Sequence, residues 1–525
     1  MFMIRKTTFP GCAIRAVVGG LFFTSLAMTG SARAADTTEE LIKLMHSKGM
    51  LTPAETSAFL EKHQMEKAAS SSTSAGKPMT VVPGGERYLQ TISDNVARDI
   101  KDNVKQEVKN ELRDEIARDI KIDAHTASVP DWTKRIRFGG DMRMRHQSEY
   151  YDPANSTFVK PDKPTELLNS TVDRSRERYR IRVGAKLKVN EQMEGEFRIA
   201  TGNESDPVST NDTLGDTFNK DTVTLDLGYV RWKPFAQSST WTGNAALTLG
   251  RMPNPFFSTD LVWDKDVNPE GAAMNLMIPM GPRFKGHLTA AAFSIQEVEW
   301  SQQDKWLYGG QVGLEYSPRT TLNAQIYAAY YDYRNIEGEM NEPNLTLNDF
   351  TAPAFIQKGN SIFDINPLTG NSNYKAALAM DYNQFNLTAM VDVGIFEPIH
   401  VVFLADYVEN LGYDDTAIYE RTGVHVEEQT SGYQYGIAVG YPTVQELWDW
   451  RLSLYYKYLE SDAVLDAFTD SDFHGGGTNA KGWILGGDLG VYKNTWLATR
   501  WLSTTEIDGP PFAIDTLQID LNVKF

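Results

Sequence analysis

The chain has 525 residues, a formal net charge of −18 and a mean hydropathy of −0.39. This composition excludes a bundle of transmembrane helices, because a helical span needs about 20 mostly apolar residues and only residues 17–28 approach such a stretch. The acidic balance argues against nucleic-acid binding, which requires a basic surface. Apolar residues make up 41% of the chain and aromatic residues 11%, so the chain is too apolar to be disordered.

The first 34 residues have the pattern of a secretory signal peptide. Four basic residues and no acid accompany an apolar stretch, and Ala32-Arg33-Ala34 resembles a small-residue cleavage site. A membrane anchor is the alternative, but the stretch is short and contains serine, threonine and glycine. Removal of residues 1–34 would take away four positive charges and change the formal net charge from −18 to −22. The only cysteine, Cys12, lies here, so we expect an exported mature chain without a disulfide, a cysteine nucleophile or a thiolate metal site.

Residues 35–67 predict a small helical hairpin. Gly49 is suited to end the first helix, and Thr52 and Pro53 are suited to the cap and first position of the second. Residues 68–87 are rich in serine, glycine and proline, which is typical of a flexible linker.

Residues 88–125 predict a long helix with a narrow apolar stripe. Apolar side chains recur every four residues, at Ile92, Val96, Ile100, Val104, Val108, Leu112, Ile116 and Ile120. Because charged residues fill most of the gaps, we expect this stripe to pack against copies of itself as a periplasmic coiled coil. A single helix lying on the rest of the protein, or a partly disordered arm, is the alternative.

From about residue 130 the pattern changes to a period of two. In residues 178–189, RYRIRVGAKLKV, apolar side chains alternate with arginine and lysine, which predicts a strand with one apolar and one wet face. Sixteen strands are predicted over 130–525, at 135–149, 177–190, 192–202, 221–235, 243–253, 270–280, 285–298, 304–317, 320–334, 380–395, 399–411, 430–442, 446–460, 480–493, 494–503 and 514–525.

These strands suit a membrane barrel better than a soluble sandwich or propeller. Most are about 10 to 15 residues long, enough to cross a bilayer when tilted. Their polar faces carry stacks of arginine that a packed core could not tolerate without pairing. The connections alternate between short and long, and aromatic residues lie near many strand ends. We therefore expect an all-β transmembrane barrel of about 16 antiparallel strands, with the short turns and both chain ends on the periplasmic side.

Three segments resemble a bacterial outer-membrane "putative porin" family: DWTKRIRFGGDMRMR at the first strand, LGRMPNPFFSTDLVWDKDVNPEG at 249–271, and the C-terminal stretch that begins FTDSDFHGGGTNAKGW at 468. A helical segment before the barrel also recurs in that family. The resemblance implies a diffusion pore in the outer membrane of a Gram-negative bacterium and supplies no catalytic residue. The apolar alternation that ends in Leu521, Val523 and Phe525 resembles the signal read by the barrel-assembly machinery.

Basic side chains concentrate on the polar faces of the first two strands. They are Arg135, Arg137, Arg143 and Arg145 on the first strand, and Arg178, Arg180, Arg182 and Lys186 on the second. If the apolar faces meet lipid, these residues form a basic wall in the lumen. Alternatively, the arginines pair with luminal acids across the strands and fill the barrel, and the two interpretations are compatible.

The third long connection, 253–270, is rich in proline, aromatic and acidic residues. In sixteen-stranded general porins the third loop folds inward and narrows the pore. By that analogy, four acidic side chains would face the basic wall: Asp260, Asp264, Asp266 and Glu270. Opposed charges across a water-filled constriction screen solutes by charge, dipole and size. An ordinary extracellular loop is the alternative.

The sequence contains no enzyme motif of the HExxH, Gly-rich phosphate-loop or GxSxG type. His474 lies beside Asp470 and Asp472 in a glycine-rich segment. This arrangement is compatible with a cation site, but a turn that requires positive backbone angles is the stronger interpretation. We expect no catalytic residue, no cofactor and no metal.

The favoured function is an outer-membrane porin for the passive diffusion of small hydrophilic solutes. The expected partners are outer-membrane lipid, the barrel-assembly machinery and further copies of the chain, with a homotrimer favoured, and not nucleic acid. The alternative is an envelope anchor, in which residues 36–125 tether the outer membrane to peptidoglycan and the barrel is closed or gated. A barrel enzyme and a sheath for an electron-transfer cytochrome are more remote alternatives.

Overall fold

A computed structural model of the chain describes residues 133–236, 244–299, 301–367 and 373–525. The predictions made for 1–34, 35–67, 68–87 and 88–125 lie outside the described residues. Among the described residues, no helix is long and apolar enough to cross a membrane.

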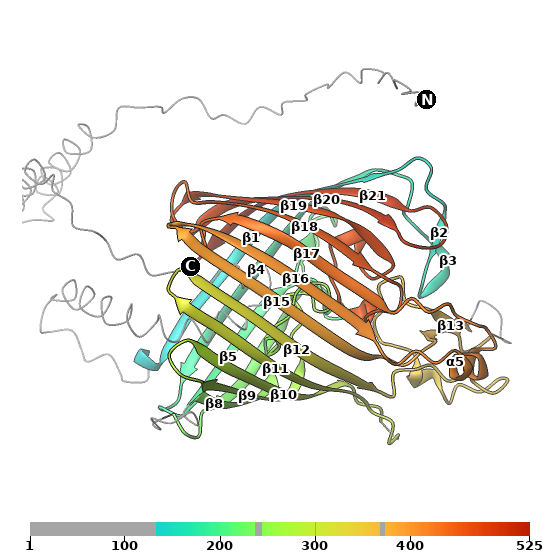
Figure 1. Cartoon of the computed structure of the whole chain (residues 1–525). Helices are drawn as coiled ribbons and strands as arrows, with labels where there is room; N and C mark the ends of the chain where they lie inside the picture. Colours follow the sequence, from blue (N-terminus) through green and yellow to red (C-terminus); the bar gives the residue numbers. More distant parts are fainter. Residues whose placement is uncertain (1–132, 237–243, 300, 368–372) are drawn as a thin grey trace, which may run out of the picture. The chain divides into compact units, whose positions relative to one another are not determined.

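Sixteen strands of the described residues close into one antiparallel barrel (Figure 1), which confirms the predicted fold class. β1 (Ile136–Tyr151) closes the barrel by pairing with both β4 (Arg174–Lys188) and β21 (Ala513–Lys524). The other barrel strands, in order, are β5 (Met193–Thr201), β7 (Val223–Trp232), β8 (Ala245–Arg251), β9 (Glu270–Pro279), β10 (Phe284–Gln296), β11 (Lys305–Arg319), β12 (Leu322–Arg334), β15 (Asn383–Phe396), β16 (Ile399–Asn410), β17 (Ser431–Gly440), β18 (Trp450–Leu459), β19 (Ala480–Tyr492) and β20 (Thr495–Glu506).

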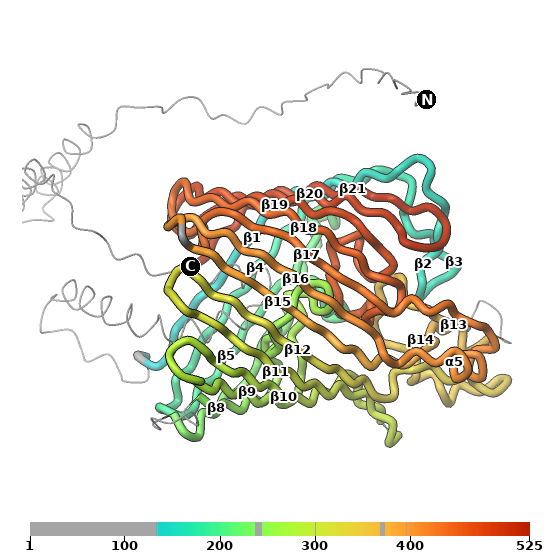
Figure 2. The backbone as a smooth tube through the Cα atoms, in the orientation of Figure 1, coloured from blue at the N-terminus to red at the C-terminus, as the bar shows by residue number. Residues whose placement is uncertain are grey.

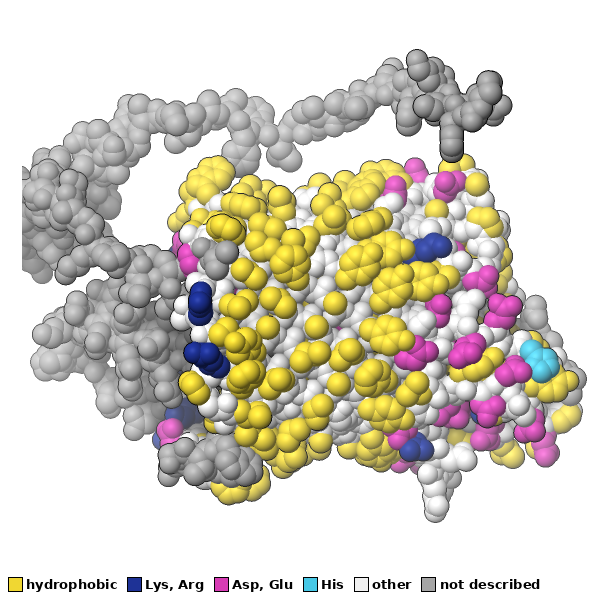
Figure 3. All heavy atoms as spheres, in the orientation of Figure 1, with side chains coloured by type: hydrophobic (Ala, Val, Ile, Leu, Met, Phe, Trp, Pro, Cys, Tyr) yellow, Lys and Arg dark blue, Asp and Glu magenta, His cyan; other side chains and the backbone are white. Residues whose placement is uncertain are grey.

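The alternation of the sequence separates two faces of the barrel wall. In β1, Met142 and Met144 are exposed at 40% and 48%, whereas Arg143 and Arg145 are buried on the other face. Figure 3 shows hydrophobic side chains spread over the face of the barrel in view, with acidic side chains gathered toward the end that carries the long loops. Lipid cannot solvate charged groups, so the apolar face turns outward and the polar face lines the interior.

The connections between strands differ in length at the two ends of the barrel. Short turns lie at the end where the chain finishes, and long loops extend from the opposite end (Figures 1 and 2). The long connections span 152–173, 202–222, 252–269, 335–382, 411–430 and 460–479. Most predicted strand boundaries shift by three residues or fewer, and the largest shift is at the strand expected from 446. It begins at Trp450, because residues 441–449 form a longer turn in which Trp448 has a φ of 72°.

Small elements occupy the long loops. A hairpin of β2 (Phe158–Lys160) and β3 (Lys163–Leu168) follows β1, and β13 (Ile362–Asp364) pairs with β14 (Ala376–Leu378). The two-residue β6 (Asp212–Thr213) pairs with β4. The α-helix α5 (Asp415–Thr422) begins where the Asp414 side chain accepts hydrogen bonds from two backbone N–H groups, and it ends at Gly423 in the left-handed conformation.

The main apolar core lies inside the barrel. The loops 252–269, 335–382 and 460–479 contribute buried side chains that pack against the inner faces of β10–β12. Trp263, for example, makes an edge contact with Tyr331 of β12 and stacks on Phe468 of the 460–479 loop. These contacts hold loop segments within the barrel, so loops as well as strands shape its lumen.

Candidate functional site

The basic side chains of the first two barrel strands face one another across the β1–β4 pair. Arg143 lies opposite Arg180, and Arg145 lies opposite Arg178. Like charges directly opposite each other destabilise a sheet unless counter-charges lie nearby. Asp141, which lies opposite Arg182, supplies one such charge: its carboxylate is 2.8 Å from the Arg180 guanidinium and 2.9 Å from that of Arg182.

Arg145 has the tightest pairing in this basic wall. Its Nε and NH2 atoms donate to the two carboxylate oxygens of Asp520 in β21, at 2.8 and 2.9 Å. Its NH1 atom also donates to Asp472 of the 460–479 loop at 3.2 Å. Arg500 of β20 donates to the same Asp472 at 3.0 Å. The loop carboxylate therefore bridges cations from two different strands.

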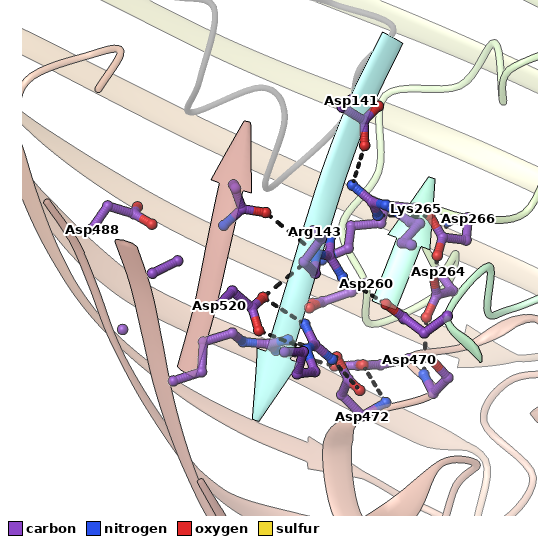
Figure 4. Close-up of a pocket in the computed structure, with 18 of the residues that line it drawn as sticks. Asp141, Arg143, Asp260, Asp264, Lys265, Asp266, Asp470, Asp472, Asp488 and Asp520 are labelled. Carbon is purple, nitrogen blue, oxygen red and sulfur yellow. Dashed lines mark hydrogen bonds and ion pairs between the residues drawn. The ribbon is translucent and has the colours of Figure 1, made fainter. Parts of the chain in front are cut away.

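The 252–269 loop places acidic side chains against this wall, as drawn in Figure 4. Asp266 is buried, and its Oδ1 lies 3.5 Å from Arg182 and 3.7 Å from Arg180. Asp260 lies 3.3 Å from Lys457 of β18. Asp264 does not reach the arginines: its Oδ2 accepts a hydrogen bond from the Ser471 backbone at 2.9 Å.

Aromatic packing and backbone hydrogen bonds hold this loop in place. The Phe256 ring packs against Gly309 of β11, where an added Cβ would lie 2.3 Å from the ring. Gln311 accepts a hydrogen bond from the Phe257 backbone N–H at 2.8 Å and donates to its carbonyl at 2.7 Å. Gly309 allows the Phe256 ring to approach the β11 backbone closely. The side-chain amide of Gln311 supplies hydrogen-bond partners to the buried N–H and C=O groups of Phe257.

The two inward loops also bind each other. Asp264 N–H donates to the Phe468 carbonyl at 2.7 Å, and Thr469 Oγ1 donates to the Leu261 carbonyl at 2.9 Å. The second loop, 460–479, thus also lies against the basic wall. The sequence interpretation did not assign it there, although it singled out Asp470 and Asp472.

Burial and neighbouring charges shift the pKa values of the acidic loop side chains, and the direction differs from one side chain to the next. Burial acts to raise the pKa of Asp266, but the guanidinium groups of Arg180 and Arg182 outweigh it and hold that pKa well below its ordinary value. The pKa of Asp472 is likewise low, because Arg145 and Arg500 outweigh burial. Burial and then the adjacent Asp266 raise the pKa of Asp264 to about 8.

Four of the predicted residues lie away from this cluster of charged side chains. Arg135 ends a short 3-10 helix, η1 (Thr133–Arg135), before the barrel, and Arg137 is exposed near the start of β1. Lys186 lies 3.6 Å from Glu196 in β5. Glu270 pairs with Arg251 at 2.5 Å and does not reach the arginines of β4.

The predicted C-terminal signal residues lie at the closing seam of the barrel. Leu521 is exposed on the outer face of β21, and Val523 pairs with Met142. Phe525 exchanges two backbone hydrogen bonds of 3.0 Å with Gly140 of β1.

His474 does not join Asp470 and Asp472. It is buried with a φ of 56°, its Nδ1 lies 3.0 Å from Thr504 Oγ1, and burial holds its pKa well below the usual value. Asp470 instead pairs with Lys457 at 3.0 Å. Within the described part of the chain, no group of three or more His, Cys, Asp or Glu side chains is placed to hold a metal ion.

The charged wall and the inward loops enclose a cavity of about 310 Å³. Nine lysine or arginine residues and eight aspartates line it, so its charges nearly balance. Figure 4 shows aspartates from both loops and from β1, β19 and β21 around Arg143 and Lys265. Sequence reasoning missed Lys265, because it lies between two acids in what reads as an acidic loop. It also missed Asp520, which occupies a luminal position of the period-two pattern in β21.

A closed sixteen-strand barrel with an apolar outer belt and a charged interior is an outer-membrane channel protein. Residues 35–525 match the family described as "Putative porin", and the chain belongs to this family. Family and fold are those of a channel in the outer membrane of a Gram-negative bacterium rather than those of an enzyme. No protein of curated function matches the sequence.

Several solved structures are similar to the chain. The high-pH structure of Pseudomonas putida OprB has 12% identity and a TM-score of 0.43, over 75% of this chain and 95% of that one. The outer-membrane channel DcaP of Acinetobacter baumannii has 11% identity and a TM-score of 0.39, over 74% and 97%. Salmonella typhi OmpF in complex with daunomycin has 9% identity and a TM-score of 0.39, over 74% and 97%.

Proposed function

We propose that the protein is a porin that lets small hydrophilic solutes diffuse passively through a water-filled channel. The observation that carries this proposal is the contact of Asp266, on an inward loop, with Arg180 and Arg182 of the barrel wall. Apolar packing of the loops fills part of the lumen, but a charged cavity remains beside them, and this cavity supports a water-filled path.

The basic wall and the two acidic loops act as the selectivity filter in this proposal. Positive charges come from β1 and β4, and the loop carboxylates face them. Such an arrangement orients water and solute dipoles across the pore and discriminates by charge as well as by size. We expect a modest preference for anions, because Arg178 donates to neutral groups of Gln147, Ser209 and Asn211 and has no carboxylate of the described residues within 4.0 Å.

The protein is proposed to work as a homotrimer inserted by the barrel-assembly machinery. The N-terminal residues are assigned in this proposal to an export signal and to a periplasmic coiled coil that joins the copies. Exposed apolar side chains on the outer face are proposed to meet outer-membrane lipid.

Conductance of the purified full-length protein in planar lipid bilayers tests this function. We expect discrete steps, grouped in threes, and a reversal potential in a KCl gradient that indicates anion preference. The triple variant R178Q/R180Q/R182Q should lose that preference, because three positive charges leave the wall. A folded, heat-modifiable barrel without conductance would overturn the porin proposal and favour the envelope anchor, which co-sedimentation with peptidoglycan would then test.

A further inference from the structure

Most guanidinium groups of the constriction are engaged by carboxylates. Arg145 is held by Asp520 and Asp472, at distances of 2.8 to 3.2 Å. Arg182 lies 2.9 Å from Asp141 and 3.5 Å from Asp266. Breaking such a buried pair leaves an uncompensated charge, so these arginines are poor candidates for binding a solute that must also leave.

Lys265, unlike these arginines, is exposed to the cavity, because its two neighbours in the loop are anchored on either side of it. Asp264 is tied to the 460–479 loop through Ser471 and Phe468, and Asp266 is tied to the β4 wall and to Thr210. Both aspartates are only 6% exposed, whereas the lysine between them is exposed and lines the cavity (Figure 4). No carboxylate of the described residues lies within 4.0 Å of its ammonium group.

Among the wall arginines that line the cavity, Arg143 is the most loosely held. Its guanidinium lies 3.5 Å from Asp520, and its hydrogen bonds to Asn522 and Asn211 are both 3.4 Å long. The Asp520 carboxylate lies closer to Arg145, at 2.8 Å, and therefore compensates the charge of Arg143 only in part. Arg143 can therefore turn its planar N–H groups toward a ligand at small cost.

The two cations act on each other across the cavity. The surrounding protein, the guanidinium of Arg500 and that of Arg143 lower the pKa of Lys265. The carboxylates of Asp472 and Asp264 act in the opposite direction but do not outweigh burial and the two guanidinium groups. A bound anion would relieve the repulsion.

We propose that Lys265 and Arg143 form a transient binding step for the carboxylate group of small organic acids that pass through the channel. The planar fork of Arg143 matches a carboxylate, and the mobile ammonium of Lys265 adds a second point of contact. The proposal rests on the proposed porin function and names the solute class that the constriction favours.

Bi-ionic reversal potentials of the full-length protein, with potassium chloride on one side of a planar bilayer and potassium acetate on the other, test this proposal. We expect K265Q to lower the acetate-to-chloride permeability ratio by roughly threefold or more, since the variant removes the less compensated charge of the pair. K265R keeps the charge and should keep most of the ratio. K285Q is the matched control, because Lys285 is a luminal lysine that already pairs with Glu315 at 3.0 Å.

The outcomes separate this inference from the proposed function. A wild-type protein without any conductance would overturn both. Conducting K265Q channels with the wild-type acetate-to-chloride ratio would overturn the carboxylate site alone, as would an equal loss in K285Q, which would indicate a general field effect. A loss confined to K265Q and rescued by K265R would support the site.

Discussion

The carboxylate of Asp266 lies 3.5 Å from the guanidinium of Arg182, and this contact ties an inward loop to the barrel wall. Asp266 is buried, so the pair is shielded from the salt that weakens surface ion pairs. The same carboxylate lies 3.7 Å from Arg180 and accepts a hydrogen bond from Thr210. One side chain thus connects three segments around the cavity.

Replacing Asp266 with asparagine should loosen the 252–269 loop. The variant keeps the shape but removes one counter-charge of Arg180 and Arg182, at a cost of about 3 kcal/mol. We expect faster amide exchange in residues 252–269 and noisier, larger conductance steps. E270Q is the control, because Glu270 is exposed at the loop end. Equal exchange in wild type and D266N would show that this ion pair does not hold the loop.

Replacing Trp263 with alanine should release both inward loops together. Trp263 is 4% exposed and packs between Tyr331 and Phe468, so truncation should cost about 3 to 5 kcal/mol through lost burial and the cavity left behind. Limited proteolysis should then cut at both 252–269 and 460–479. Truncation of Leu347, which is 73% exposed, should leave the cleavage pattern unchanged. Cleavage in only one loop would contradict the packing described here.

The packing of the outer loops should depend on pH through Asp466. Burial raises the pKa of Asp466 to about 7, and its Oδ1 has no hydrogen-bond partner in the described structure, while Oδ2 accepts from the Gln357 backbone at 3.1 Å. The contribution of a carboxyl with a raised pKa is fully present below its unfolded pKa of 3.8, and it is lost progressively as pH rises from there to about 7.

Amide exchange around residues 357–361, corrected for the intrinsic rate, should therefore quicken as pH rises from about 4 to about 7 and change little above that. D466N, which cannot ionise, should remove this pH dependence. D415N is the control, since Asp415 lies on the first turn of α5 in another loop. An unchanged pH profile in D466N would rule out Asp466 as the titrating group.

Removing Phe525 should impair assembly of the barrel in cells. Phe525 exchanges two backbone hydrogen bonds with Gly140 at the β1–β21 seam, and the chain end matches the expected assembly signal. We expect less heat-modifiable protein in the outer membrane and more protein degraded in the periplasm. Val424→Ala, which changes an exposed loop side chain, is the control. Wild-type levels of folded protein without Phe525 would show that assembly does not require it.

The period-two alternation was enough to predict the barrel and nearly all strand positions. Each strand residue faces either the lipid or the aqueous lumen, and its polarity follows from that environment. The alternation also placed Arg143, Arg145, Arg180 and Arg182 on one wall. The partners of these arginines could not be read in the same way. Asp472 and Asp520 meet Arg145 from segments far away in sequence, and the inward fold of 460–479 depends on aromatic packing that has no local period.

Loop residues were the least predictable part of the site. Lys265 lies between two acidic residues in the sequence, which gave no sign that it lines the cavity. In the structure Asp264 and Asp266 are buried against different segments, and Lys265 is exposed between them. Glu270 carries the same charge as Asp266 but lies at the start of β9, where it pairs with Arg251. Composition therefore indicated an acidic loop but could not tell which carboxylate meets the wall.

The central claim is that a water-filled path passes the constriction, and solute entry into proteoliposomes tests it most directly. Swelling rates should be measured with uncharged solutes of increasing size, for the wild-type protein and for D266N. We predict that small solutes enter and that the swelling rate of the wild type falls steeply as solute size increases. In D266N this fall in swelling rate should occur at a larger solute size. Proteoliposomes that contain the folded barrel and admit no solute, down to glycerol, would contradict the claim.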